Sequence, residues 1–361
     1  MPGPKTVITE DGIMRKNEPA AAGSRILENF ISPIEATVTE RLTDGGYGVA
    51  GRAVTDEFGI APLAPGSWAI SDASRRVADR EAGFCLCNDV FGKQRKLAAE
   101  NGLFYIRPTY GTVSRYGLIP TVPSMDVIGV VCAELSAGFD LLRVIAGNDP
   151  NDGAMFPEKA YDYQIPEKKP AVALPGSIIA KADAATRAAI KKFAGNFETA
   201  DVELKYFGLC GQTAYILGSA EISGVVSRYD GLKFGYRAEG YGGLDDLYIK
   251  TRSGGFGYET KLAAVVGSMV LSRGHYANYY EKAMKLRRLI KESMRFDDYD
   301  LIVLPCAIGG DPYEDLPLYA LANLAGLPSV SFRYENAAIQ LIAGVKNEGM
   351  IIKAAREAGI W

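Results

Sequence analysis

Histidine and cysteine, two side chains that often act as bases or nucleophiles, are scarce in this 361-residue chain. His275 is the only histidine, so a zinc-binding histidine cluster is excluded and a Ser-His-Asp triad would depend on this residue alone. His275 lies in a long helical pattern with aromatic neighbours, where a packed or half-exposed role is more frequent than a catalytic one. The cysteines are odd in number and scattered, which predicts buried reduced thiols: Cys85, Cys87, Cys132, Cys210 and Cys306.

Two stretches hold side chains that could form a hydrolytic centre. Ser67, Ser71 and Ser74 lie in APGSWAISDASRR, and Lys93 opens the polar run KQRK at 93–96. A Ser-Lys pair is chemically reasonable if the lysine is desolvated enough to be neutral near pH 7. Turn formation and helix capping are the more frequent roles of such serines. Four long polar residues in a row predict an exposed turn, because their ordering costs rotamer entropy.

No pattern in the chain favours a cofactor, a metal or a nucleic acid. The glycine spacing of GYGVAG at 46–51 resembles a dinucleotide-binding loop, but it follows a helical segment where a strand is required. The net charge of −3 gives no global attraction to nucleic acid or membrane. No signal peptide or full membrane span is evident, so we expect a cytoplasmic protein. One basic helix face is interspersed with glutamates and predicts a solvated surface: Lys282, Lys285, Arg288 and Lys291.

The elements that must position these side chains alternate between strands and helices along the whole chain. Apolar spacing predicts helices over 24–42, 182–194, 208–228, 258–273, 275–295 and 347–358, and a strand leading into a helix within 124–147. Apolar runs predict strands in GLFYIR, AVAL, DLIVLP, SVSFRYE and AAIQLIAG. This alternation indicates an α/β fold with a central sheet covered by helices.

The segment RPTYGTVSRYGLIPTVPSMDVIGVV resembles the amidase-signature family, and within it the A subunits of glutamine-dependent tRNA amidotransferases. The likeness continues through LLRVIAGNDPND, AEISGVVSRYDGLKFGYR, TRSGGFGYETK, YDLIVLPCA and NLAGLPSVS, and covers roughly residues 103–345. It implies a large mixed β-sheet with helices on both faces. We expect an N-terminal extension over 1–23 and a single truncated domain over 24–361.

The family chemistry implied by the resemblance uses a nucleophilic serine in a loop of the type D-T-G-G-S-I-R. A second serine relays the proton and a lysine accepts it. Aligned without gaps from RPTYG, the loop occupies DVFGKQR, and Lys93 stands in place of the nucleophile. The other matched loop residues are Asp89, Val90, Phe91, Gly92 and Arg95.

The other two catalytic positions also depart from the family. Equal spacing puts Ala69 on the relay serine, and the best match of the lysine-bearing strand puts Thr55 on the lysine. Leu262 and Ala263 replace an arginine pair that follows a lysine in the A subunits, so a contact with a glutamine carboxylate loses support. We therefore expect that the amidase centre is lost and that the long side chains of the loop fill or cover a former oxyanion site.

Three hypotheses remain from the sequence. The favoured one is a catalytically inactive relative of the A subunits with a binding or scaffold role. Its partner would be a protein, either an amidotransferase-type subunit or another copy, and tRNA would be reached only indirectly if at all. The second is an amidohydrolase with a relocated centre, in which Ser67, Ser71 or Ser74 attacks and Lys93 is the base. The third is a decayed gene product that folds without a selectable function.

Overall fold

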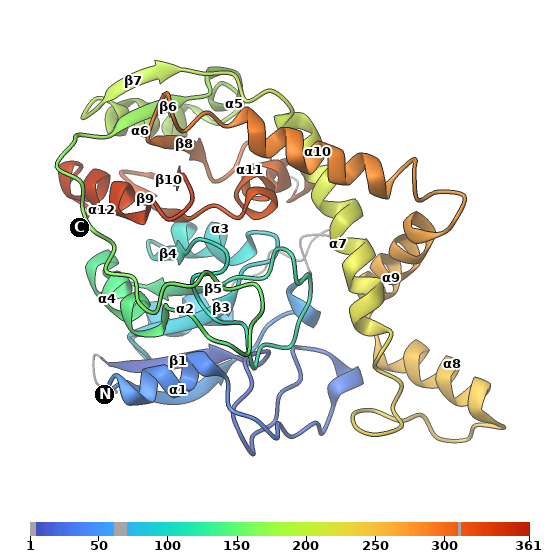
Figure 1. Cartoon of the computed structure of the whole chain (residues 1–361). Coiled ribbons are helices and arrows are strands. Elements are labelled where there is room, and N and C mark those ends of the chain that lie inside the picture. Colours follow the sequence, from blue (N-terminus) through green and yellow to red (C-terminus); the bar gives the residue numbers. More distant parts are fainter. Residues whose placement is uncertain (1–4, 61–70, 310–311) are drawn as a thin grey trace.

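The computed structural model describes residues 5–60, 71–309 and 312–361. Its centre is a ten-stranded sheet in the order β2-β1-β3-β5-β4-β9-β10-β8-β6-β7 (Figure 1). Strand pairing is parallel at both ends of the sheet and antiparallel in the middle, which confirms the expected large mixed sheet. The strands are β1 (Thr6–Glu10), β2 (Gly48–Ala53), β3 (Phe84–Asn88), β4 (Phe104–Arg107), β5 (Ile128–Cys132), β6 (Ala171–Leu174), β7 (Glu198–Asp201), β8 (Leu301–Pro305), β9 (Ser329–Tyr334) and β10 (Ala337–Ala343).

Helices cover both faces of this sheet, as the sequence predicts. Side chains alternate along each strand, so Ile339 and Leu341 of β10 pack with one set of helices while Ile342 packs on the opposite face. The first set is α1 (Thr37–Asp44), α4 (Leu135–Ile145), α6 (Ala184–Ala194) and α12 (Glu348–Glu357). The opposite face carries α2 (Asp72–Ala78), α3 (Lys93–Glu100) and α11 (Pro312–Ala325). A short helix, α5 (Gly176–Ile179), follows β6.

Part of the expected N-terminal extension lies inside the sheet. Residues 6–10 form β1, which pairs in parallel with β2 on one side and with β3 on the other. Because side chains alternate along a strand, Val7 joins the core on the α1 and α4 face while Ile8 joins the core beneath α2 and α3. Glu10 therefore points toward α3, where it meets the candidate site.

Three local predictions are wrong, two in the extent of a helix and one in the kind of structure. The helix predicted over 24–42 is reduced to a 3-10 turn at Arg25–Leu27 and α1, because Pro33 cannot continue a helix and disfavours helical backbone before it. The helix predicted over 275–295 begins only at Tyr280, as α10 (Tyr280–Ser293). The polar run at 93–96 is the first turn of α3 instead of an exposed turn.

An arm of four helices stands to one side of the sheet. It consists of α7 (Cys210–Val226), α8 (Leu244–Gly255), α9 (Tyr258–Leu271) and α10, with α8 and α9 on the far side of α7 from the sheet (Figure 1). Gly267 allows α9 to lie against α7, since a Cβ there would be 2.0 Å from the Ser219 carbonyl oxygen. Within the described part of the chain, none of the helices is long and apolar enough to cross a membrane.

Candidate functional site

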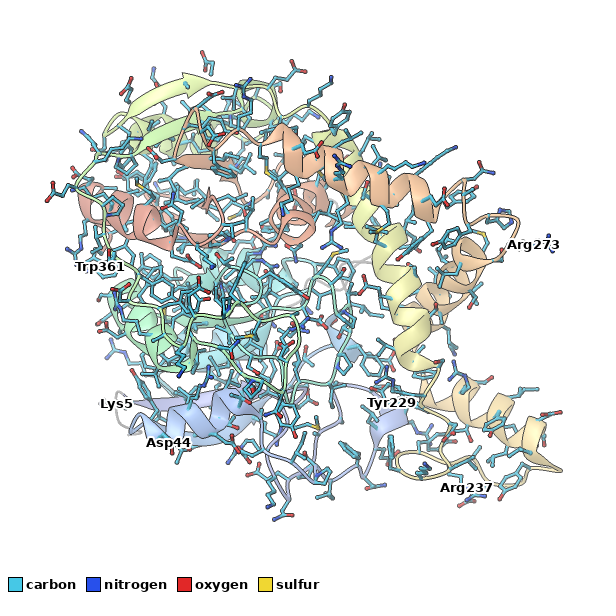
Figure 2. All side chains as sticks on the ribbon, viewed as in Figure 1. Lys5, Asp44, Tyr229, Arg237, Arg273 and Trp361 are labelled. Carbon is cyan, nitrogen blue, oxygen red and sulfur yellow. The ribbon has the colours of Figure 1, made fainter. Side chains whose placement is uncertain are left out.

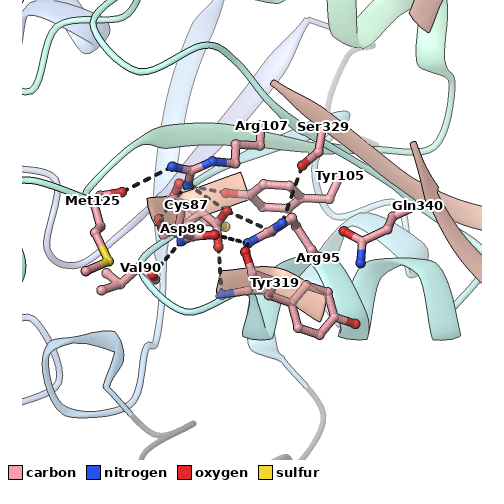
Figure 3. Close-up of polar contacts among 12 residues, drawn as sticks. Cys87, Asp89, Val90, Arg95, Tyr105, Arg107, Met125, Tyr319, Ser329 and Gln340 are labelled. Carbon is pink, nitrogen blue, oxygen red and sulfur yellow. Dashed lines mark hydrogen bonds and ion pairs between the residues drawn. The ribbon is translucent and has the colours of Figure 1, made fainter. Parts of the chain in front are cut away.

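The loop between β3 and α3 is organised by one buried carboxylate. Asp89 Oδ1 accepts a hydrogen bond from the Gly92 backbone N–H at 2.9 Å, which closes the turn that starts α3. Asp89 Oδ2 lies 2.8 Å from Arg95 Nε and 2.8 Å from Arg107 Nη1 (Figure 3). All three side chains are buried. A single carboxylate thus holds two guanidinium groups from α3 and β4 in the interior.

Carbonyl groups and one amide complete this network. Arg107 donates to the Asp89 and Met125 carbonyl oxygens, and Arg95 donates to the Tyr319 carbonyl oxygen at 3.0 Å. Asn323 of α11 accepts a hydrogen bond from Arg95 and donates to the Val90 carbonyl oxygen. Burial lowers the pKa of Arg95, and the neighbouring Asp89 carboxylate opposes this shift. The loop is therefore fixed from both β4 and α11.

Gly92 is required by the geometry of this loop. Its φ of 86° lies in the left-handed region, which glycine adopts without strain. A Cβ at this position would be 2.2 Å from the Tyr319 ring. Tyr319 is anchored in turn by a hydrogen bond from its hydroxyl to the Cys306 carbonyl oxygen. Glycine directly before Lys93 thus lets the start of α3 lie close to the Tyr319 ring of α11.

Lys93 forms an ion pair with Asp56. It is the first residue of α3, and its ammonium lies 2.9 Å from Asp56 Oδ1. This is the only hydrogen bond that the Lys93 ammonium forms with the residues that the structure describes. Asp56 follows Thr55, and neither belongs to β2, which ends at Ala53. A carboxylate therefore faces the side chain at the loop position predicted for the nucleophile.

Of the predicted serines, Ser71 and Ser74 do not hydrogen-bond to this lysine. Ser67 and Ala69 lie outside the described residues. Ser71 is the N-cap of α2, where its Oγ accepts a hydrogen bond from the Ser74 backbone N–H and donates to Gln94 Oε1. Ser74 is fully buried and its hydroxyl has no hydrogen-bond partner among the described residues. The capping role predicted for Ser71 is confirmed.

A buried chain of polar groups that the sequence reasoning missed runs beneath the loop. Gln94 Nε2 donates to Glu10 Oε1 at 2.6 Å, and the Asn88 backbone N–H donates to Glu10 Oε2 at 2.8 Å. Burial raises the pKa of Glu10 to about 8. Glu10 and Thr55 line one small cavity. In a strand formed by TVITE, Glu10 shares its face with the apolar Ile8, and this spacing could have indicated that Glu10 points inward.

A larger cavity lies between α7 and α11. It has a volume of about 470 Å³ and is mainly apolar, with Tyr215 and Ile216 on one wall and Leu316 and Pro317 on the other. Gly211 completes the α7 wall, close to Pro317. Because α11 also carries Asn323 and Tyr319, this cavity borders the helix that fixes the loop. Such a cavity can accept an apolar group of a ligand or partner.

The structure also locates the histidine, the cysteines and the basic helix face that the sequence singled out. His275 is exposed in the turn between α9 and α10, where its ring makes an edge contact with Tyr279. The prediction that His275 lies on a helix is therefore wrong, because Gly274 disfavours a helix at this point. The five cysteines are free and buried, as predicted. The basic face of α10 is exposed, and among its residues Arg288 pairs with Glu292. No metal-binding group is found within the described residues.

Comparison with known proteins places this geometry in a family. The family model described as "Amidase" matches residues 76–349. The A subunit of glutamyl-tRNA(Gln) amidotransferase from Lachnoclostridium phytofermentans is 34% identical over 365 residues, which cover 90% of this chain and 74% of that protein. Its counterpart from Trichodesmium erythraeum is 32% identical over 409 residues, which cover 98% of this chain and 84% of that protein. The chain therefore belongs to the amidase-signature family.

Within this family the chain is a homologue of the amidotransferase A subunits. The crystal structure of the A subunit of glutamyl-tRNA(Gln) amidotransferase from Thermotoga maritima aligns with a TM-score of 0.74 and 24% identity, covering 98% of this chain and 82% of that chain. A chain from a vestigial protein complex, described as revealing the evolutionary origins of an s-triazine catabolic enzyme, aligns with a TM-score of 0.79 and 20% identity. This alignment covers 98% of the present chain and 84% of that chain. Both likenesses confirm the expected fold.

Proposed function

We propose that this chain is a catalytically inactive homologue of the amidotransferase A subunits that acts as a binding or scaffold protein. The observation that carries this proposal is the ion pair between Lys93 and Asp56. Lys93 stands where the resemblance puts the nucleophilic serine, and Thr55, next to Asp56, stands where it puts the catalytic lysine. An ammonium–carboxylate pair thus lies at the matched place of the nucleophilic serine and beside the matched place of the lysine.

A lysine at this position does not replace the serine chemically. An amine attacks a carbonyl through its free lone pair, whereas the Lys93 side chain is engaged in an ion pair with Asp56 at 2.9 Å. If Lys93 were acylated by an amide substrate, the product would be a second stable amide instead of an ester that water can cleave. Both arguments support loss of turnover at this loop.

The contacts of the described serines do not favour a relocated Ser-Lys centre. Ser71 is engaged with Gln94 and the start of α2, and Ser74 is buried. An attacking hydroxyl needs a base within about 3 Å and access to substrate, and neither serine hydrogen-bonds to Lys93. Ser67 lies outside the described residues, and a reagent that labels any activated serine tests it directly.

A binding role is supported by what the chain retains. The buried network around Asp89 keeps the loop and α11 in place although the residues for chemistry are replaced. Relatives of this chain are named as a subunit of an amidotransferase and as part of a protein complex. We therefore propose a protein partner, either an amidotransferase-type subunit or another copy of this chain, and contact with tRNA only through such a partner.

Ammonia release from glutamine and a panel of simple amides tests the catalytic half of the proposal. The purified chain is compared with the Thermotoga maritima A subunit, and with its own Lys93→Ala and Asp56→Asn variants. We expect release at the buffer rate from the chain and from both variants. Ammonia release above that rate that is lost in Lys93→Ala would overturn the proposal.

Chemical cross-linking in the native cell, followed by purification of the chain, tests the binding half. We expect a cross-linked complex of defined mass whose formation does not require Lys93, because the ion pair is internal. Recovery of the chain only as a lone monomer would contradict the binding role while leaving the catalytic result unaffected.

A further inference from the structure

Helix α9 has a buried side of mostly small residues and, opposite it, an exposed side of apolar residues. One side packs against α7 and is buried: Thr260, Ala263, Gly267 and Val270. The other side forms a row that we name the outer seam: Tyr258, Leu262, Val265 and Met269. A helix at the surface normally has a polar outer side, so the packing of the fold does not require apolar residues in the outer seam.

The outer seam is strongly exposed. Tyr258 is 69% exposed and Val265 is 68% exposed, and the two other members are exposed as well. Single exposed apolar residues are common, whereas a contiguous row on one helix marks an interaction surface.

The spacing of the outer seam fits another helix. Its members follow one another at steps of four, three and four residues, which is the a/d repeat of helices that pack side by side. Lys261 and Ser268 flank the seam and are exposed, as polar residues beside such a seam are. The occupant that fits this face is therefore a helix with a matching apolar seam.

Two charges make the outer seam complementary to itself. Glu259 lies at the start of α9 and Arg273 lies just beyond its end, and neither has an ion pair or hydrogen bond from its side chain among the described residues. Figure 2 shows Arg273 at the outer edge of the arm. Counted along the sequence, the midpoint between Leu262 and Met269 lies at 265–266, and the midpoint between Glu259 and Arg273 lies at 266. Two copies of α9 running antiparallel would thus place each glutamate opposite the arginine of the other copy, with the apolar residues between them.

We propose that the outer seam docks against the outer seam of a second copy of this chain, antiparallel, about a twofold axis near Val265. Such an isologous contact needs a surface that is complementary to itself under rotation, which the residue order of α9 provides. The 14 residues of α9 extend for roughly 21 Å, at 1.5 Å per residue. This contact is smaller than a standard interface, so we expect a weak dimer with a Kd on the order of micromolar.

Sedimentation equilibrium of the full chain over a wide concentration range tests this proposal. Val265→Asp is expected to weaken the dimer about tenfold or more, because it places two carboxylates at the axis. Glu259→Arg or Arg273→Glu alone is expected to weaken the dimer several-fold, since each brings like charges together at both ends. The double variant restores the opposite pairing and is expected to regain the parent affinity. A docking site for an unrelated partner would not show this rescue.

Cross-linking with engineered cysteines tests the register. Val265→Cys is expected to form an intermolecular disulfide under mild oxidation, because residues at the axis approach their own copies. Ser268→Cys is the matched control: it is equally accessible, lies on the same helix and stands off the axis. The natural cysteines are buried and do not compete. A monomer at all concentrations, equal cross-linking of both variants, or binding of the seam to lipid vesicles without dimer formation would overturn the proposal.

Discussion

Replacing Asp89 by asparagine removes the one negative charge that holds two buried guanidinium groups. The Asp89 carboxylate lies 2.8 Å from both Arg95 and Arg107, and all three side chains are buried. Breaking a buried pair by removing one partner costs about 3 to 5 kcal/mol, because the other charge is left uncompensated. Here two charges are left, so we expect a loss at the upper end of that range, about 5 kcal/mol. The whole free energy of unfolding of a domain is only about 5 to 15 kcal/mol.

Urea denaturation followed by far-UV circular dichroism measures this loss. The matched control is Asp140→Asn, which removes the same charge from an ion pair with Arg143 at 2.7 Å. The Asp140 side chain is 69% exposed, so its pair contributes about 0 to 1 kcal/mol. We expect Asp89→Asn to be largely unfolded without urea, or to unfold far earlier than the control. Equal unfolding of the two variants would refute the view that Asp89 organises the loop.

Three further predictions concern the loop glycine, the buried glutamate and the cysteines. Gly92→Ala is expected to destabilise the chain by about 2 to 5 kcal/mol, since left-handed strain adds to a clash with the Tyr319 ring. Gly102→Ala has the same kind of backbone but open space, so thermal unfolding should show only about 1 to 2 kcal/mol there. Burial raises the pKa of Glu10 to about 8, so this residue stabilises the fold below pH 4.5 and that contribution is lost as the pH rises to 8, at about 1.4 kcal/mol per pH unit. Glu10→Gln should remove that slope from urea unfolding curves measured between pH 5 and 8, and an unchanged slope would contradict the assignment. Thiol titration with Ellman's reagent should find almost no reactive cysteine until the chain unfolds, because burial raises the pKa of the thiols of Cys85, Cys87, Cys132, Cys210 and Cys306.

Much of the fold could be predicted because its signals are local. The apolar run DLIVLP became β8, and SVSFRYE with AAIQLIAG became the antiparallel pair β9 and β10. The three- and four-residue steps from Leu135 to Ile145 became α4. The failures are local as well: Pro33 interrupts one predicted helix, and the turn around Gly274 delays another.

The contents of the candidate site could be predicted only in part. The resemblance located the loop and the replaced nucleophile, because that loop is contiguous in sequence. It did not identify the partners that fill the site, since these come from distant segments. Asp56 is 37 residues from Lys93, and Glu10 is 84 residues from Gln94. Asn323 is 233 residues from Val90, and no periodic pattern links residues so far apart.

Intact-mass analysis after treatment with a broad fluorophosphonate tests the loss of the amidase centre most directly, because it detects an activated serine without knowledge of the substrate. The Thermotoga maritima homologue is labelled beside this chain as the positive control. We expect no adduct on this chain. An adduct that maps to Ser67, Ser71 or Ser74 and disappears in Lys93→Ala would contradict the account and establish a rebuilt Ser-Lys centre.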